Sequence, residues 1–249
     1  MEMIRQALSF EGLWILALAA FGAGIVRGFA GFGTAMIFIP IAALVVSPVY
    51  AILMMLVFDL FGPIVLLPRA WRDGEPRDVG LLGIGAIIGL PMGVYLLTRL
   101  DPVMFRWLIS VLALSLLILL VGGWRYRKPL GAMMTGLVGV VSGFFCGVAA
   151  LPGPPVILSY MSSSRRAHVV RGNMILFLFL VDLLTFAVFA LNGLLVPAPL
   201  LVGAVLVLPY TVAGLIGQRI FNPDMENVYH RVAYAMIAFS AIAGLPLWD

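Results

Sequence analysis

Two long stretches without a charged residue constrain this chain more than any other feature. Residues 129–164 and residues 183–218 each run for 36 positions between charged neighbours. A helix that spans a bilayer needs about 20 predominantly apolar residues, so each stretch holds more than one such element. The whole chain is 63% hydrophobic and 10% charged, whereas a soluble domain carries about 25% charged residues. The sequence therefore predicts an all-α polytopic membrane protein in a lipid bilayer.

The rest of the composition excludes several other classes. The 15 basic residues lie mainly in the connections between apolar segments, where membrane topology explains them, so we expect no nucleic-acid partner. The single cysteine, Cys146, excludes an intramolecular disulfide and a multi-cysteine metal site. No phosphate-binding G-x-x-x-x-G-K-[ST] pattern occurs, which argues against ATP hydrolysis. We expect no cofactor, no metal and no removable signal peptide.

Ten apolar segments follow one another along the chain, and two pairs of them flank a break rich in Gly and Pro. Counting each pair as one broken segment leaves eight hydrophobic segments, each broken one followed by three transmembrane helices. The ten segments are 12–28, 34–46, 49–68, 79–98, 107–123, 131–147, 154–161, 172–191, 198–218 and 232–247. Such interrupted segments at corresponding positions of two halves are the best sequence indication of a transporter site.

The two halves repeat each other within one transmembrane domain, residues 1–249. Gly24-Ile-Val-Arg-Gly28-Phe29 matches Gly139-Val-Val-Ser-Gly143-Phe144 at an offset of 115, and Asp59 matches Asp182 at an offset of 123. We place the internal repeats at residues 12–123 and 131–247. By this register Ser142 is the repeat partner of Arg27.

The positive charges predict that the repeats are inverted. If each broken segment is a hairpin that returns to its own face, one face collects eleven basic residues and the other only Arg5, Arg99 and Arg106. If each broken segment crosses once, both faces hold seven. Because the positive-inside rule favours the unequal distribution, we expect re-entrant hairpins, inverted repeats and both termini on the outer side.

The stretch Gly28-Phe29-Ala30-Gly31-Phe32-Gly33 predicts the candidate site. Three glycines in six residues disfavour a helix, since each costs about 1 kcal/mol relative to Ala. A break there would leave backbone N–H groups free and direct the N-terminal dipole of a helix resuming at Thr34 toward an anion. We expect the second break at Gly147–Pro155, with prolines starting the next helix. The alternative is close helix contact through small residues. The predicted substrate-binding residues are Arg27, Gly28, Gly31, Gly33, Thr34, Ser142, Cys146, Gly147 and Gly153.

Three charged residues inside apolar segments need partners. A charge near mid-membrane costs at least about 3 kcal/mol, and the planar fork of Arg27 suits an oxyanion. The alternative is that Arg27 pairs with Asp59 or Asp182. The two aspartates, each expected near mid-helix, are candidates for proton coupling, or else hold backbone N–H groups or Arg27. Cys146 is also explained as a small packing residue, and Asn173, Thr185, Thr211 and Gln218 either line a path or bond locally.

With its two broken segments ending in Pro40 and Gly153-Pro154-Pro155, the chain resembles the TauE/SafE sulfite-exporter family of membrane permeases. The resemblance covers nearly the whole chain, including an arginine (Arg106, Arg231) at the last helix of each half. It implies transport of sulfite or of organosulfonates such as sulfoacetate. The second motif departs from the usual denser glycines at Val148-Ala149-Ala150-Leu151.

These observations predict a secondary transporter of a small anion in a bacterial inner membrane, with a midplane site between the two broken segments. The open alternatives are an anion channel, an intramembrane enzyme and a scaffold without substrate. We do not expect an enzyme, because no H-E-x-x-H or G-x-S-x-G pattern occurs and both histidines lie in connections. Substrate, direction, the coupling proton or ion, and a homodimer stay open.

Overall fold

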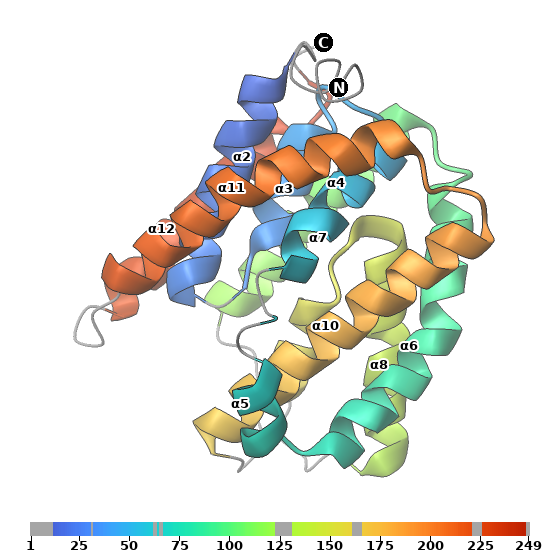
Figure 1. Cartoon of the computed structure of the whole chain (residues 1–249), viewed down its shortest axis with the longest axis vertical. Helices are drawn as coiled ribbons and strands as arrows, with labels where there is room; N and C mark the ends of the chain where they lie inside the picture. The colour runs from blue at the N-terminus through green and yellow to red at the C-terminus, as the bar shows by residue number, and fades with distance from the viewer. Residues whose placement is uncertain are drawn as a thin grey trace. The chain divides into compact units, whose positions relative to one another are not determined.

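The computed structural model describes residues 12–30, 32–61, 64, 67–122, 131–160, 166–220 and 226–247 of the chain. These residues form eleven helices and no strand (Figure 1). The helices are α2 (Leu13–Ala30), α3 (Thr34–Ala42), α4 (Pro48–Phe61), α5 (Leu67–Asp73), α6 (Pro76–Leu97), α7 (Pro102–Val121), α8 (Ala132–Ala149), α9 (Gly153–Tyr160), α10 (Ala167–Leu191), α11 (Pro197–Ile220) and α12 (Glu226–Ala243).

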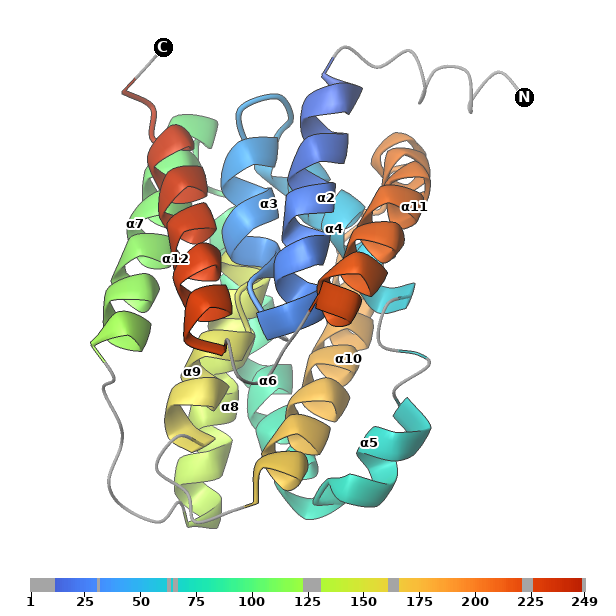
Figure 2. The ribbon, with the colours of Figure 1, turned by 90° about the vertical axis from the view of Figure 1, so that its left-hand side faces the viewer.

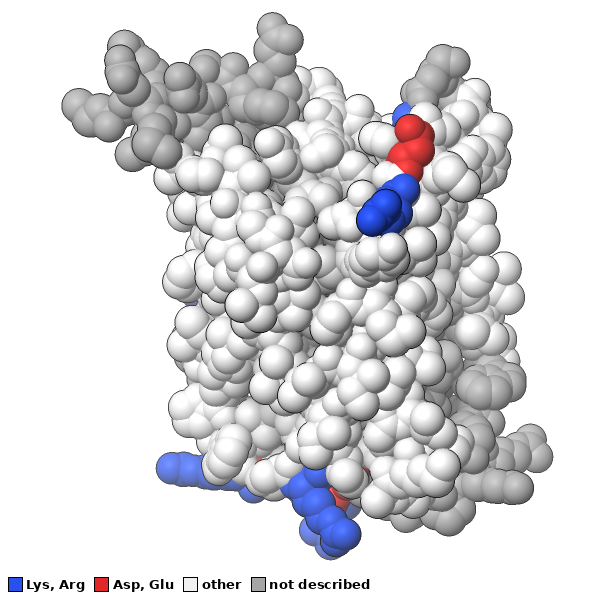
Figure 3. All heavy atoms as spheres, turned by 90° about the vertical axis from the view of Figure 1, so that its right-hand side faces the viewer, with Lys and Arg blue, Asp and Glu red and all other residues white. Residues whose placement is uncertain are grey.

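Five of these helices are long and apolar enough to cross a bilayer: α6, α7, α8, α10 and α11. Three shorter apolar helices are α2, α4 and α12. Large apolar side chains point outward, among them Leu191 at 87% and Met133 at 80% exposure, and the face drawn in Figure 3 has few charged side chains on a broad uncharged surface. Such a surface fits lipid rather than water.

The described helices fall close to the predicted segments. The largest differences are at α4, which ends at Phe61 just before Gly62 and Pro63 in the sequence, and at α5, a short helix not foreseen in the connection. Pro cannot donate a backbone hydrogen bond and disfavours the helix before it, which explains the end of α4. The all-helical class is confirmed, and the eight-segment inverted topology stays a prediction.

The chain divides into two compact units, and neither coincides with a sequence half. Unit 1 comprises residues 1–59, 100–121 and 195–249, and unit 2 comprises residues 60–99 and 122–194. In unit 1, α11 from the second half packs along α2 from the first. In unit 2, α6 from the first half packs along α8 from the second. Each unit therefore combines the broken segment of one half with a helix of the other.

In unit 1, α2 and α3 lie side by side and run in opposite directions, as Figure 2 shows. The chain thus turns back within the broken segment, which is the local arrangement of a hairpin. Helix α12 packs against both α3 and α7. Arg106 of α7, expected in a connection, is instead buried and donates hydrogen bonds to the carbonyl oxygens of Gly244 (3.2 Å) and Leu245 (3.4 Å) after the end of α12.

Glycines set the closest helix contacts in both units. A Cβ on Gly28 of α2 would lie 2.3 Å from the carbonyl oxygen of Gly214, and a Cβ on Gly147 of α8 would lie 2.3 Å from that of Leu90. Neither position can hold a side chain without moving a backbone. Small residues let helices approach this closely in membranes.

The helix bounds suggest a second register for the repeat beside that of the motif. Helices α2 and α8 are both 18 residues long, and the starts of α2, α3 and α4 precede those of α8, α9 and α10 by 119 residues. The motif had suggested 115, one helical turn less, because the glycines at 139, 143 and 147 recur every four residues and fit either alignment. In this second register Cys146 takes the position of Arg27, whereas Ser142 does so in the register of the motif.

Candidate functional site

The first break is shorter than the sequence predicted. Helix α2 continues through Gly28 to Ala30, and α3 begins at Thr34 as expected. The prediction that Gly28 is unwound is wrong, since its contact with α11 offsets the poor helix propensity of glycine. Gly33 is the N-cap of α3 at φ 100°, a left-handed conformation that favours glycine, and it makes no side-chain cap. Gly31 lies outside the described residues.

A chain of buried hydroxyl and carboxyl groups lies beside this break. The Tyr210 hydroxyl of α11 donates a hydrogen bond to Asp59 Oδ1 of α4 at 2.6 Å and lies 3.1 Å from Thr34 Oγ1, at the first residue of α3. Thr34, Asp59 and Tyr210 are 2%, 7% and 4% exposed. Three helices of unit 1 thus meet through one chain of buried polar side chains.

Asp59 lies in the last turn of α4, not in the middle of a helix as expected. The α4 helix ends early at Phe61, which brings the carboxylate to the end of the helix. Aromatic contacts hold the neighbouring side chains. The ring of Phe58 lies 4.7 Å from that of Tyr210 and 4.9 Å from that of Phe38 on α3. The rings fix the position of the Tyr210 hydroxyl between α3 and α4.

Arg27 belongs to the same cluster. It is half-buried in the last turn of α2, and its guanidinium interacts electrostatically with Tyr210, as Asp59 does. Its position near the C-terminus of α2 is also favourable to the helix dipole. Thr34, Asp59 and Tyr210 therefore meet from three helices at the α2–α3 break, and Arg27 of a fourth helix acts electrostatically on Tyr210.

The second break has a different chemistry. Helix α8 ends at Ala149, and Ala150 follows at φ 55°, the only non-glycine residue with positive φ in the described part of the chain. The N–H groups of Ala150 and Leu151 bond to the carbonyl oxygens of Cys146 and Phe145. Helix α9 then starts at Gly153, with two prolines in its first turn as predicted.

The predicted polar residues of the second break bond within unit 2. Ser142 Oγ donates to the carbonyl oxygen of Pro152. Cys146 Sγ lies 3.4 Å from Thr185 Oγ1 of α10, and the Thr185 hydroxyl also donates to the carbonyl oxygen of Val181 at 2.7 Å. Asp182, 6% exposed, lies one turn before Thr185 on α10. This break has no charged residue at the position of Arg27.

The family model for the sulfite exporter TauE/SafE matches residues 16–244. The match covers both broken segments and all eleven described helices in whole or in part. The chain belongs to the TauE/SafE sulfite exporter family. Comparison with curated proteins gives no match, and no solved structure matches either. Family membership and the apolar helices together make this an integral membrane protein of a transporter family for a small anion.

Sequence reasoning missed one residue of the buried polar chain beside the α2–α3 break, Tyr210. It lies in a charge-free stretch, and its two partners are 151 and 176 residues away in the chain. The signal was a tyrosine at mid-segment, because a buried phenol needs a hydrogen-bond partner. Thr211 and Gln218, named as path-lining candidates, are exposed instead. Thr185 bonds locally, as the alternative stated.

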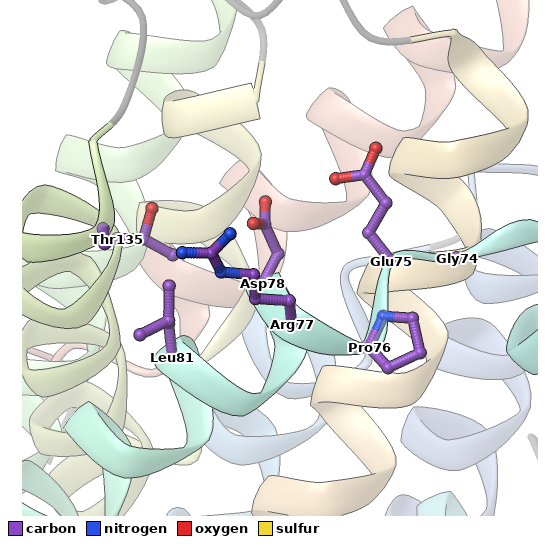
Figure 4. Close-up of a pocket in the computed structure, with 8 residues that line it drawn as sticks. Gly74, Glu75, Pro76, Arg77, Asp78, Leu81 and Thr135 are labelled. Atoms are coloured by element: carbon purple, nitrogen blue, oxygen red, sulfur yellow. The ribbon is translucent and has the colours of Figure 1, made fainter.

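A surface pocket of about 570 Å³ lies elsewhere in unit 2 and contains none of the predicted site residues (Figure 4). Its lining combines two acidic residues and one basic residue around the start of α6. The residues are Gly74, Glu75, Pro76, Arg77, Asp78, Leu81, Ala132 and Thr135. This mixture of charge does not select an anion. Within the described residues, no group of three or more His, Cys, Asp or Glu is placed to hold a metal ion.

Proposed function

We propose that the protein is a secondary transporter that moves a small oxyanion, sulfite or an organosulfonate, across a bacterial inner membrane. We further propose that the α2–α3 break of unit 1 contributes to a midplane anion site. The observation that carries the proposal is the buried hydrogen-bonded chain of Thr34, Tyr210 and Asp59 from three helices, with Arg27 of a fourth helix acting electrostatically on Tyr210. Polar and charged groups inside a membrane protein mark substrate and ion pathways.

Arg27 is the anion ligand in this proposal. Its planar guanidinium offers a bidentate pair of donors that matches two oxygens of a sulfite or sulfonate group. Helix α3 begins without a side-chain cap, so its first-turn N–H groups add donors on the same side. In the second break the corresponding predicted ligands are Gly147, Gly153 and the uncharged Ser142 and Cys146, so the two breaks differ in chemistry.

Thermal stabilisation of the purified protein by sulfite and by sulfoacetate tests the role of Arg27. We expect both anions to raise the melting temperature of the wild type. Arg27→Ala should fold but lose this stabilisation, and Arg27→Lys should retain part of it because the charge remains without the fork. Arg99→Ala, which removes an exposed arginine, is the matched control and should behave as the wild type.

A different result is expected if Arg27 pairs with Asp59 instead of binding the anion. If Arg27 neutralises Asp59, Arg27→Ala leaves a buried carboxylate unpaired and costs roughly 3–5 kcal/mol of folding stability. The double change Arg27→Ala with Asp59→Ala would then restore both stability and anion binding. That rescue would remove Arg27 from the anion site.

A further inference from the structure

We infer that Asp59, Tyr210 and Thr34 form a hydrogen-bond relay that couples anion binding to the binding of one proton, with Tyr210 as the coupling residue. The inference rests on the proposed function and deepens it. The coupling is positive, which means that binding of the proton increases the affinity for the anion. Tyr210, which the sequence did not indicate, thereby gains a role.

The distances determine the direction of the relay when Asp59 is ionised. A carboxylate only accepts hydrogen bonds, and the Tyr210 hydroxyl has a single proton, which it donates to Asp59 at 2.6 Å. The second contact of Tyr210, 3.1 Å from Thr34 Oγ1, must therefore use the Thr34 proton. In this state Thr34 presents only lone pairs to the α2–α3 break.

Protonation of Asp59 reverses the relay. The protonated carboxyl of Asp59 donates a hydrogen bond to the Tyr210 oxygen, and the Tyr210 hydroxyl donates to Thr34 Oγ1. The Thr34 hydroxyl keeps its proton but no longer donates it to Tyr210. Because Thr34 is the first residue of α3, its freed O–H can then donate to an anion at the break. One proton taken up from water thus removes a negative charge and changes Thr34 from acceptor to donor.

The charges around the relay also predict that protonation of Asp59 increases the affinity for the anion. Helix α3 carries no titratable side chain, α2 contributes Arg27, and α11 contributes Tyr210. Arg27 and Asp59 both act electrostatically on Tyr210, so an anion held by Arg27 lies near an ionised Asp59 and is repelled by it. Neutral Asp59 removes the repulsion. Anion affinity should therefore rise as the pH falls.

The test measures affinity for sulfoacetate against pH with the full-length protein in lipid nanodiscs. Sulfoacetate stays ionised across the neutral range, whereas sulfite itself takes up a proton there. We expect wild-type affinity to rise by up to about tenfold per pH unit as the pH falls, the limit for one linked proton. About one proton should be taken up per anion bound.

Tyr210→Phe keeps the ring against Phe58 and removes only the hydroxyl. Its affinity should depend less steeply on pH than that of the wild type, because the relay is lost while the repulsion between Asp59 and the anion remains. Thr34→Val should reduce the pH dependence in the same way, and Thr34→Ser should keep the wild-type slope. Tyr160→Phe in unit 2 is the matched control, because this buried tyrosine, which accepts a hydrogen bond from the Asn173 amide (3.0 Å), belongs to the unit that does not contain the relay. It should retain the wild-type slope.

Each outcome is decisive. A Tyr210→Phe variant with the wild-type slope, or a wild type whose affinity does not change with pH, overturns the relay and leaves the proposed function standing. Failure of the wild type to bind either sulfoacetate or sulfite at any pH removes the proposed function itself. If Tyr210→Phe does not fold, the Thr34→Val and Thr34→Ser pair gives the same decision.

Discussion

Each of the two breaks contains one residue in a left-handed backbone conformation, a glycine in the first and an alanine in the second. Gly33 occupies a left-handed conformation at φ 100°, which glycine adopts without strain. Ala150 occupies φ 55° after α8, where an L residue with a Cβ pays about 1–2 kcal/mol. The first break has a glycine in this conformation and the second an alanine, so the second break carries strain that the first does not.

Ala150→Gly should therefore raise the free energy of unfolding. Relief of the left-handed conformation exceeds the backbone entropy that glycine loses on folding, and we expect a net gain of about 0.5–1 kcal/mol. Denaturation in detergent measures it. Ala149→Gly, the neighbouring helical position, is the control and should lose stability. A lower stability for Ala150→Gly would show that Ala150 is not strained.

The same two breaks show what the sequence could predict at residue level. The start of α3 at Thr34 followed from glycines before an apolar run, and the burial of Asp59 and Asp182 followed from charges inside apolar segments. The partner of Asp59 could not be found this way, because Tyr210 lies 151 residues along the chain. Local patterns contain no information on which distant helix supplies a hydroxyl.

Among the elements, glycines allow close contact in two helix pairs, α6 with α8 and α11 with α2. Gly85, Gly89 and Gly93 of α6 face α8 at spacings of four, and a Cβ on Gly89 would lie 1.9 Å from the carbonyl oxygen of Val140. Spacing by four places residues on one helix face. The sequence did indicate close contact as an alternative use of such glycines, but not which helices they join.

Gly89→Ala should separate α6 from α8 and lower stability by about 1–3 kcal/mol, the cost of overpacking. Gly136→Ala is the matched control on α8, because a Cβ there meets nothing within 4 Å. It should be neutral or gain up to about 1 kcal/mol from better helix propensity. Thermal unfolding of both variants decides. Equal effects of the two substitutions would contradict a role for Gly89 in the α6–α8 contact.

For the whole molecule, hydropathy predicted where the helices lie but not how the chain divides. The two compact units each mix helices from both halves, since α6 and α11 pack against the broken segment of the other half. A sequence repeat alone suggests two separate halves. The side-by-side α2 and α3 in Figure 2 favour the hairpin form of the first broken segment.

Cysteine accessibility tests the inverted topology. In a Cys146→Ser background, single cysteines at Ser47 and Ser163 should be labelled from opposite faces of the membrane, because hairpins return the chain to the face where it entered. Ser47 is exposed between α3 and α4, and Ser163 lies outside the described residues. The count of eleven basic residues against three carries this prediction. Labelling of both positions from the same side would contradict the inversion.

Uptake into vesicles measures the transport of a small oxyanion by the protein itself. Vesicles of known orientation containing the purified protein are given labelled sulfite or sulfoacetate, with and without a pH gradient, beside vesicles without protein. We expect protein-dependent transport that is faster when the gradient supplies protons on the side of the anion, and loss of this transport in Arg27→Ala. Uptake equal to that of protein-free vesicles for both anions, in either gradient direction, would contradict the account.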